Sequence, residues 1–469
     1  MTQFIKTLVS HFIIFLLAFS CFGQSTYLPQ DDKSAHFLDR LEILLQTNPD
    51  LNVMTPKPFS RKMAVDVAEM ADSLNRNYPY DAFYKLSKVD QYNLNDLLMN
   101  STEWVTGSKE SFKSKHPIWN TIYKTKANFF EVNEKDFFLA LNPVLQENQS
   151  IETGNSERVF LNSKGFTMRG MIANKLGFST YLTDNQERGP IYFQDRVTAS
   201  GYPAVPGAGY YKHFKTTAFD YFDGRGSIYF GIWKYFQVQF GYDKNFIGNG
   251  YRSLLLSNYS APYLFLRINT RIWKLNYDLM FMEMINQHLP GDYEYPHKYA
   301  AIHHLSFNAA KWLNVGLFDN VVFSRADHFE FSYLNPVIFL VAAQQQNGSP
   351  DKVTVGLDFK ANIGHATQIY GQFVINEFVL HEVLHYSDGW WGNKQGLQLG
   401  FKYINVFNIK NLDFQFEMNL VRPYVYSHND TVSNYSNYNQ PLAHPLGANF
   451  REFVTMLRYQ PAPKWTVET

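Results

Sequence analysis

The nine residues LDFQFEMNL, from Leu412 to Leu420, alternate strictly between apolar and polar side chains. Successive side chains of a β-strand point to opposite faces, so this pattern predicts a strand with one apolar and one polar face. The same alternation recurs in QVQFGYDK (237–244), KLNYDLMF (274–281), TVGLDFKANI (354–363) and GLQLGFKYI (396–404). We therefore predict that the chain is β-structure from about Tyr123 onward.

Composition helps to decide between a soluble β-sandwich and a membrane barrel. Roughly fifteen alternating segments follow one another after Tyr123, and aromatic residues make up 17% of the chain. Polar faces that mix Asp, Lys, Glu and Asn suit a water-filled lumen, whereas aromatic-rich faces suit lipid. A closed barrel also leaves no unpaired backbone in hydrocarbon. We expect an all-β transmembrane β-barrel of about 16–18 antiparallel strands in a Gram-negative outer membrane, with a secreted soluble β protein as the alternative.

The N-terminus has the pattern of an export signal. Lys6 precedes an apolar run from Leu8 to Phe19, and small residues follow it. This predicts a secretory signal peptide at residues 1–23, with lipidation of Cys21 as the alternative. Cys21 is the sole cysteine, so its removal with the signal leaves no disulfide or thiolate metal site. Basic and acidic residues balance at 42 each, which gives no indication of a nucleic-acid partner.

A short helical region precedes the strands. SAHFLDRLEILL (34–45), SRKMAVDVAEMADSL (60–74) and SKVDQYNLNDLL (87–98) each place apolar residues on one helical face. Ser60 and Ser87 stand where helix N-caps are expected. We predict a small periplasmic helical bundle over residues 24–118, followed by the barrel over residues 119–469.

The stretch GYDKNFIGNGYRSLLLS, Gly241 to Ser257, resembles the Wzi-like capsule-assembly family of outer-membrane proteins. The likeness is greatest to its Bacteroidetes branch, which includes the RemB-type gliding-motility proteins. Similar stretches follow in order over nearly all of the chain after about residue 120: FTMRGMI (166–172), VPGAGYYKHF (205–214), YLNPVIF (333–339), YGQFVINEF (370–378), NLVRPYVYSHND (419–430) and PLAHPLGANFREF (441–453).

The resemblance implies a large outer-membrane barrel with a small periplasmic bundle at its base. It also implies a non-enzymatic role in capsule or exopolysaccharide attachment or assembly, with support of gliding motility and adhesion. The partners are then surface polysaccharide, outer-membrane lipid and other surface or motility proteins. A passive porin or nutrient channel is the rival function. Barrels of this kind usually end on an aromatic residue, whereas this chain stops at KWTVET (464–469), so we expect that closing strands are missing.

One motif points to a different class of protein. His381-Glu382-Val383-Leu384-His385 matches the H-E-x-x-H pattern of zinc hydrolases, which needs a helix to bring both histidines to the metal. The flanking sequence is strand-like before the motif and turn-like after it. A third ligand is also missing, because Asp388 and Trp391 stand where one such family has glycine and histidine. A zinc hydrolase is therefore a remote alternative, and we expect no catalytic residue, metal or cofactor.

Two segments supply candidate polysaccharide contacts. In GNGYRSLLLS (248–257) the glycines beside Arg252 would cradle an anionic sugar, because arginine binds carboxylates through two parallel hydrogen bonds. A tight turn in which Arg252 pairs with a lumen carboxylate is the alternative that we favour. The second segment is SHNDTVSNYSNYNQPLAHPLGANF (427–450), in which we favour a packed or hydrogen-bonded loop residue over a ligand contact for His444. The six candidates are Asn249, Tyr251, Arg252, Tyr435, Tyr438 and His444.

The order of strands predicts which connections face the outside of the cell. Periplasmic turns of such barrels are short and the long connections face outward. The insert from Ser427 to Phe450 is too long for a periplasmic turn. We therefore expect it to lie outside, together with the connection LHEVLHYSDGWWGN (380–393), and we expect the strand from Leu412 to run outward.

Overall fold

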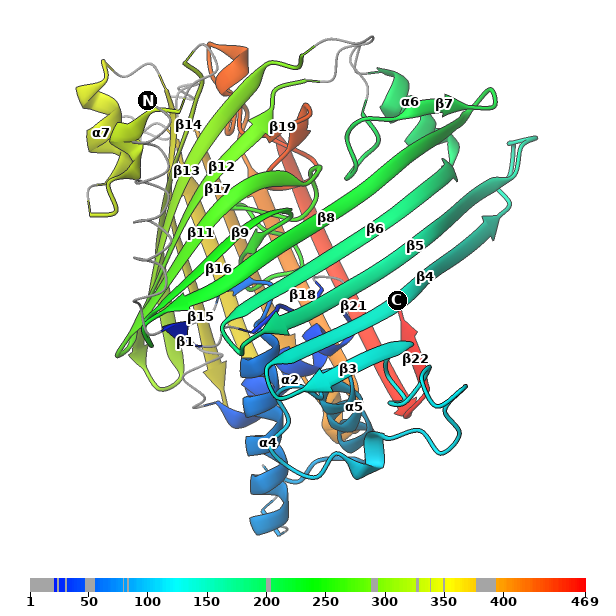
Figure 1. Cartoon of the computed structure of the whole chain (residues 1–469). Helices are drawn as coiled ribbons and strands as arrows, with labels where there is room; N and C mark the ends of the chain where they lie inside the picture. The colour runs from blue at the N-terminus through cyan, green and yellow to red at the C-terminus, as the bar shows by residue number, and fades with distance from the viewer. Residues whose placement is uncertain are drawn as a thin grey trace, which may run out of the picture.

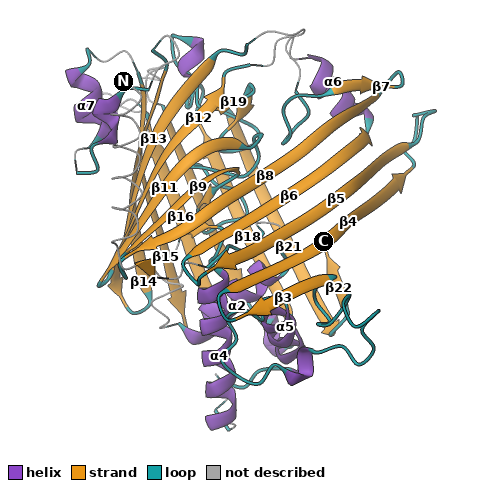
Figure 2. Ribbon diagram, viewed as in Figure 1, coloured by secondary structure: helices purple, strands orange, loops and turns teal. Residues whose placement is uncertain are grey.

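The computed structural model describes residues 21–22, 25–29, 32–46, 55–78, 80–81, 84–199, 204–287, 294–325, 329–337, 339–348, 351–376 and 394–469. Most of the predicted signal peptide and all of the His381–His385 motif lie outside these residues. Antiparallel strands dominate the fold, and the helices gather mainly at one end (Figure 2). This confirms the predicted all-β class with a small helical part.

The strands form one antiparallel sheet of 18 strands that curls into a barrel (Figure 1). Two short strands, β1 (Cys21–Phe22) and β7 (Lys212–Phe214), pair with β8. The others are β3 (Phe130–Glu134), β4 (Phe137–Ser150), β5 (Val159–Ile172), β6 (Leu176–Arg188), β8 (Ala218–Ile232), β9 (Phe236–Asp243), β11 (Tyr263–Ile272), β12 (Leu275–Ile285), β13 (His297–Ala310), β14 (Leu313–Phe323), β15 (Lys352–Ile363), β16 (Thr367–Ile375), β17 (Gln395–Tyr403), β18 (Leu412–Val421), β21 (Phe450–Ala462) and β22 (Trp465–Glu468). Their number matches the prediction.

The two ends of the barrel differ. Short turns at residues 173–175, 233–235, 273–274, 311–312 and 364–366 lie at the end that carries the helices, and long connections lie at the other. Tryptophans in three of these turns expose about half or more of their surface: Trp233, Trp273 and Trp312. Exposed aromatic residues at one level of a barrel are typical of a membrane interface.

The alternation read from the sequence separates the interior from the outer wall. On β18, Asp413, Glu417 and Asn419 are buried although they are polar. On β15, Asp358 reaches the His304 ring of β13, with 2.6 Å between Oδ2 and Nε2. Apolar side chains of the wall stay exposed on the outside, as a surface in contact with lipid requires: Leu317, Leu357, Ile369, Leu399, Phe401, Phe453 and Leu457.

Three helices, α2 (Ser34–Leu45), α4 (Arg61–Asn77) and α5 (Lys88–Met99), pack around one apolar core. Their predicted starts are present. The Ser60 hydroxyl accepts a hydrogen bond from Met63 N, and Ser87 and Asp90 form a reciprocal capping box. Such caps satisfy the free N–H groups at a helix start.

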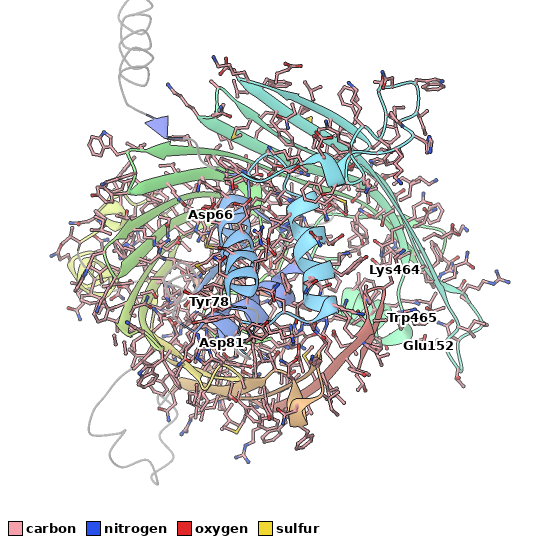
Figure 3. All side chains as sticks on the ribbon, turned by 90° about the horizontal axis from the view of Figure 1, so that it is seen from below. Asp66, Tyr78, Asp81, Glu152, Lys464 and Trp465 are labelled. Carbon is pink, nitrogen blue, oxygen red and sulfur yellow. The ribbon has the colours of Figure 1, made fainter. Side chains whose placement is uncertain are left out.

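The helices lie across the opening of the barrel at the end with the short turns (Figure 3). Helix α2 contacts the wall through ion pairs of Asp39 with Lys402 at 2.7 Å and of Glu42 with Lys360 at 2.8 Å. The Arg40 guanidinium pairs with Asp413 of β18 and with Asp90 of α5. Bundle and barrel wall are thus joined by charged groups with little exposure to water.

Candidate ligand-binding site in the barrel interior

The site is built on residues 244–262, which connect β9 to β11 and which we call the crossing segment. Instead of looping away from the barrel, this segment enters it. Its strand β10 (Phe246–Ile247) pairs with β2 (Pro56–Lys57), which precedes α4. Other residues of the segment hydrogen-bond to β16, β17 and β18, which are not neighbours of β9 or β11 in the sheet. The segment therefore runs from one side of the barrel to another.

Glu417 of β18 holds the middle of the crossing segment. Its carboxylate accepts hydrogen bonds from Tyr251 N at 2.7 Å and Arg252 N at 3.1 Å. Tyr370 Oη and Asn419 Nδ2 donate to it as well, each at 2.9 Å. The Glu417 side chain is fully buried. Four donors around one carboxylate compensate for much of the cost of removing its charge from water.

Gly250 is needed for this close approach. A Cβ atom at this position would lie 2.3 Å from the Glu417 Oε2 atom and 2.9 Å from the Tyr370 ring. The backbone reaches the carboxylate only because glycine has no side chain. This explains one glycine of the motif GNGYRSLLLS.

The second half of the crossing segment packs into an apolar core inside the barrel. Gln372 of β16 accepts a hydrogen bond from Leu254 N at 2.7 Å and donates to Ile247 O at 3.2 Å. The three leucines that follow Ser253 are fully buried. They pack with inward-facing residues of the wall and of the connection 422–449: Met280, Met282, Met284, Ile302, Tyr426, Tyr435 and Leu442.

This apolar core corrects one sequence-based expectation. A water-filled lumen lined by charges was predicted from the polar strand faces. Charged and polar residues do line the half of the barrel near the helices, but the other half is filled by the crossing segment and the connection 422–449. The Tyr426 and Tyr435 hydroxyls donate to Leu254 O at 2.7 Å and Leu255 O at 2.8 Å, so the connection folds inward instead of projecting away.

Two cavities lie on either side of the crossing segment. The bundle-side chamber, of about 310 Å³, is lined by α2, by the crossing segment and by β17, β18 and β21. The outer cavity, of about 270 Å³, is lined by residues of the crossing segment together with Pro206 and Pro445. Phe246, Tyr251 and Asn258 line both cavities. Tyr251 is 49% exposed, so its ring is available to a ligand.

The contacts of Arg252 fit parts of both interpretations made from the sequence, the ligand contact and the pairing with a lumen carboxylate. Its Nη2 atom is 3.6 Å from Glu452 Oε1, a loose contact with a lumen carboxylate. Its guanidinium also lies 4.8 Å from the centre of the Tyr251 ring. The structure therefore has the contact between Arg252 and a lumen carboxylate that we favoured from the sequence. Because the contact with Glu452 is long and Arg252 borders the outer cavity, the guanidinium can also reach a ligand.

The other predicted contacts are mostly buried. Asn249 and Tyr435 are less than a tenth exposed, and His444 is fully buried. His444 Nε2 lies 2.7 Å from Glu452 Oε2, and its ring stacks on Phe450. Burial lowers the pKa of His444, although the hydrogen bond to Glu452 opposes this. Tyr438 is half-buried, and its N–H donates to Ile285 O at 2.8 Å. Their role as polysaccharide contacts stays a prediction.

Several residues of the two cavities were not singled out from the sequence. The bundle-side chamber brings together Lys57, Lys402, Arg458 and Asp39, and the outer cavity includes Tyr259. These side chains come from helix, strand and connecting segments far apart in the chain. No local pattern marks them, so only the folded barrel brings them together.

The described part of the chain contains neither a metal-binding group of side chains nor a membrane-spanning helix. Within these residues no group of three or more His, Cys, Asp or Glu side chains could hold a metal ion. None of the helices that the structure describes has both the length and the apolar character to cross a membrane. The His381–Glu382–His385 motif lies outside this part, so the zinc-hydrolase alternative is untested there.

The geometry is that of an outer-membrane type of β-barrel. Its strands are long and antiparallel, short turns occupy one end, apolar residues face outward, and polar residues line much of the interior. Helices and a crossing segment fill a space that an open channel would leave to water.

Searches with protein-family models and among curated proteins found no match. Among solved structures, the chain is similar to Wzi of Escherichia coli, an outer membrane protein involved in group 1 capsule assembly and a carbohydrate-binding β-barrel. That match covers 93% of this chain and 81% of Wzi, at 13% identity and a TM-score of 0.49. OccK3 of Pseudomonas aeruginosa matches over 62% of this chain and 73% of its own, at 10% identity and a TM-score of 0.34.

A variant of the Rh. blastica porin is matched over 70% of this chain and 92% of its own, at 9% identity and a TM-score of 0.33. Since each of these TM-scores is below 0.5, we draw no functional conclusion from the likenesses.

Proposed function

We propose that this chain is a non-enzymatic barrel of the outer membrane that attaches or assembles capsular polysaccharide or exopolysaccharide at the cell surface. The observation that carries the proposal is the arrangement around Tyr251: an interior blocked by the crossing segment, with a cavity on its outer side. Among the described residues, the crossing segment and the helices both lie across the interior, so the barrel offers a surface to hold a long ligand.

The blocked interior favours attachment over the rival function of a passive porin. The crossing segment is bound to β16, β17 and β18 through Gln372, Gln398 and Glu417. The helices close the other end through several ion pairs. A diffusion channel needs a continuous aqueous lumen, and both obstacles would have to move to produce one.

The chemistry of the outer cavity suits a polyhydroxylated, anionic chain. Tyr251 and Tyr259 offer aromatic faces, Asn258 an amide and Arg252 a guanidinium beside the same cavity. Pockets that bind small ligands combine apolar or aromatic faces with a few well-placed polar groups. Arginine adds affinity for the carboxylate of an acidic sugar.

We place the helical region, residues 24–118, in the periplasm, and the described connecting residues 189–199, 204–217 and 422–449 at the outer end of the barrel. The short turns at the helical end and the exposed tryptophans near them support this orientation. The outer cavity then faces the side where surface polysaccharide is found.

The stretches that resemble the Wzi-like family support a polysaccharide role, and their likeness to the gliding-motility branch adds surface motility to the proposal. A strain that lacks the protein is expected to release polysaccharide into the medium and to spread poorly on agar. Loss of spreading with normal polysaccharide retention would restrict the function to motility.

Purified protein tests the binding step directly. Surface polysaccharide extracted from the bacterium that makes the protein is immobilised, and binding of the full chain in detergent is measured. We expect saturable binding that weakens by about tenfold or more in a Tyr251→Ala, Arg252→Ala variant, because each lost contact is worth about 1 kcal/mol. Absence of binding, together with a large stable conductance in planar bilayers, would favour the porin instead.

A further inference from the structure

Between β14 and β15, the described residues 324–325, 329–337, 339–348 and 351 lie over the outer wall of the barrel. We call these residues the flap. It contains helix α7 (Leu340–Gln346) and lies beside the barrel at the end away from the bundle (Figure 1). Phe329, Leu340 and Ala343 of the flap pack against the wall, where their partners include outward-facing residues of β12, β13 and β14: Leu279, Phe281, Tyr299, Ala301, Val321 and Phe323. The residues that alternate with these along β12, β13 and β14 face inward and belong to the apolar core inside the barrel.

The base of the flap is fastened at the outer ends of β14 and β15. The Arg325 guanidinium makes two contacts with the Asp351 carboxylate, at 2.6 and 2.5 Å. Tyr333 Oη donates to the same carboxylate, and Gln344 Nε2 donates to Asp351 O at 3.1 Å. Tyr333 is fully buried. These contacts give the flap a defined position.

From this base the flap reaches well down the wall. Tyr277, only two residues from the start of β12 at the bundle end, donates from its hydroxyl to Pro336 O at 2.6 Å. Asp319, in the middle of β14, accepts a hydrogen bond from Leu340 N at 2.8 Å. The flap thus covers a buried carboxylate of the wall at a level where strands of a membrane barrel pass through the bilayer.

The side of the flap turned away from the wall is apolar along much of its length, and near the base Phe331 is 77% exposed. Val337 is 89% exposed and Phe339 63% exposed, and both lie next to the residues that reach Tyr277 and Asp319. Gln345 and Gln346 are also exposed, but they lie on the arm that returns to Asp351. The stretch 329–348 contains a single charged residue, Glu330.

The backbone of the flap is also suited to hydrocarbon, where unpaired N–H groups are costly. Many of its N–H groups have partners within the flap or on the wall. The N–H groups that donate such hydrogen bonds include those of Ser332, Tyr333, Val337, Leu340, Ala342 and Ala343.

We propose that the flap is a membrane-embedded element whose exposed side contacts the acyl chains of the outer-membrane lipid. Val337 and Phe339 face the hydrocarbon, and the glutamines near the base lie at the level of the lipid headgroups. Lipid is the occupant that this side favours, because its exposed residues Phe331, Val337 and Phe339 are apolar and the stretch carries a single charge. The exposed apolar residues of the neighbouring wall, such as Leu317 and Leu357, continue the same surface. The proposal rests on the membrane location proposed above and not on polysaccharide binding.

Single-cysteine variants of the full chain, in a Cys21→Ser background, test this contact. A bimane fluorophore is attached at Val337→Cys, and the protein is reconstituted in phospholipid bilayers with bromine at mid-chain or near the headgroup. Leu357→Cys on the outer wall is the lipid-facing control. Tyr80→Cys is the aqueous control, since Tyr80 is fully exposed beyond the end of α4. Gln345→Cys reports on the base of the flap, and heat-modifiable gel migration shows that each variant is folded.

We expect mid-chain bromine to quench the label at Val337 as strongly as at Leu357 and to leave Tyr80 unaffected. The label at Gln345 should respond more to bromine near the headgroup. Quenching at Val337 by aqueous iodide, as at Tyr80, would overturn the proposal. So would a benzophenone attached at Val337→Cys that crosslinks in native outer membranes to another protein, because the flap would then be a protein interface. Polysaccharide binding is measured separately and can fail or succeed without changing these results.

Discussion

The carboxylate of Asp39 on α2 lies 2.7 Å from the ammonium group of Lys402 on β17. Lys57 approaches the same carboxylate to 3.8 Å. One acidic side chain of the bundle is therefore shared by a lysine of the barrel wall and a lysine next to β10, so it joins the bundle, the wall and the region of the crossing segment.

This relationship predicts how the bundle responds to acid. Burial raises the pKa of Asp39, but Lys402 and Lys57 more than offset this and hold the pKa below its ordinary value of 3.8. A carboxyl group with a lowered pKa stabilises the folded state at neutral pH, and this contribution is lost only as pH falls from that ordinary value through the lower folded one. The free energy of opening of α2, obtained from hydrogen exchange corrected for the intrinsic rate at each pH, should therefore stay constant from pH 7 to about 5 and fall below pH 4. A fall of this free energy near pH 6 would contradict the prediction.

Replacement of the carboxylate should loosen the bundle at neutral pH. Asp39→Asn leaves Lys402 and Lys57 without their anionic partner, which we expect to cost about 1–3 kcal/mol in the opening of α2. Hydrogen exchange measures this free energy. Asp66→Asn is the matched control, because its pair with Lys62 is exposed on α4 and should contribute less than about 0.5 kcal/mol.

Glu417→Gln should destabilise the crossing segment although the two side chains have nearly the same shape. All four hydrogen-bonding neighbours of the carboxylate are donors, so the glutamine NH₂ group would face another donor. We expect a loss of about 1–3 kcal/mol, measured as faster proteolysis or hydrogen exchange of residues 244–262. Unchanged protection would mean that Glu417 does not hold the segment.

Gly250→Ala should have a comparable effect by a steric route. The new methyl group would meet the Glu417 carboxylate and the Tyr370 ring, and overpacking of this kind typically costs about 1–3 kcal/mol. If the segment is displaced, current through single barrels in a planar bilayer should rise above that of the wild type. Gly107→Ala is the control, because no atom lies within 4 Å of its added Cβ; it should change neither stability nor current.

Tyr435→Phe separates a structural tyrosine from a ligand contact. Tyr435 is buried, and its hydroxyl donates to Leu255 O at 2.8 Å. Loss of this bond should lower stability by about 1 kcal/mol and leave the affinity for polysaccharide unchanged. A large loss of affinity in a folded variant would restore the role expected for Tyr435 from the sequence.

Accessibility to a membrane-impermeant reagent tests the proposed orientation. Ser433, in the middle of the long insert, is only 2% exposed and is a poor site for a tag. Asn429 in the same connection is exposed, so Asn429→Cys should react on intact cells. Trp119→Cys, exposed in the segment between bundle and barrel, should react only after the outer membrane is permeabilised. The opposite pattern would reverse the orientation.

Local patterns were enough to predict the strands, the helices and both serine caps. A strand such as Leu412–Val421 shows its two faces in its own sequence, because Asp413 and Glu417 turn inward while Leu412 and Phe416 turn outward. Capping depends only on residues within one turn of a helix. These are interactions between near neighbours in the chain.

The crossing segment could not be predicted in this way. Leu254 binds Gln372, 118 residues further on, and Tyr251 binds Glu417 after 166 residues, and no local period encodes either contact. One signal was present: in LMFMEMI (279–285) apolar residues occupy both faces of the strand. This loss of alternation marks the part of the wall that has an apolar core on the inside as well as a covered apolar face on the outside.

The crossing segment also constrains the order in which the barrel can form. Neighbouring strands pair as hairpins joined by turns of a few residues, so they close short loops at low entropic cost. The contacts of residues 250–254 require β16, β17 and β18, which come more than 100 residues later in the chain. The interior can therefore reach its final arrangement only after most of the wall has been made. We expect a late, slow folding phase in which the hairpins are already paired while the Tyr251 region gains protection.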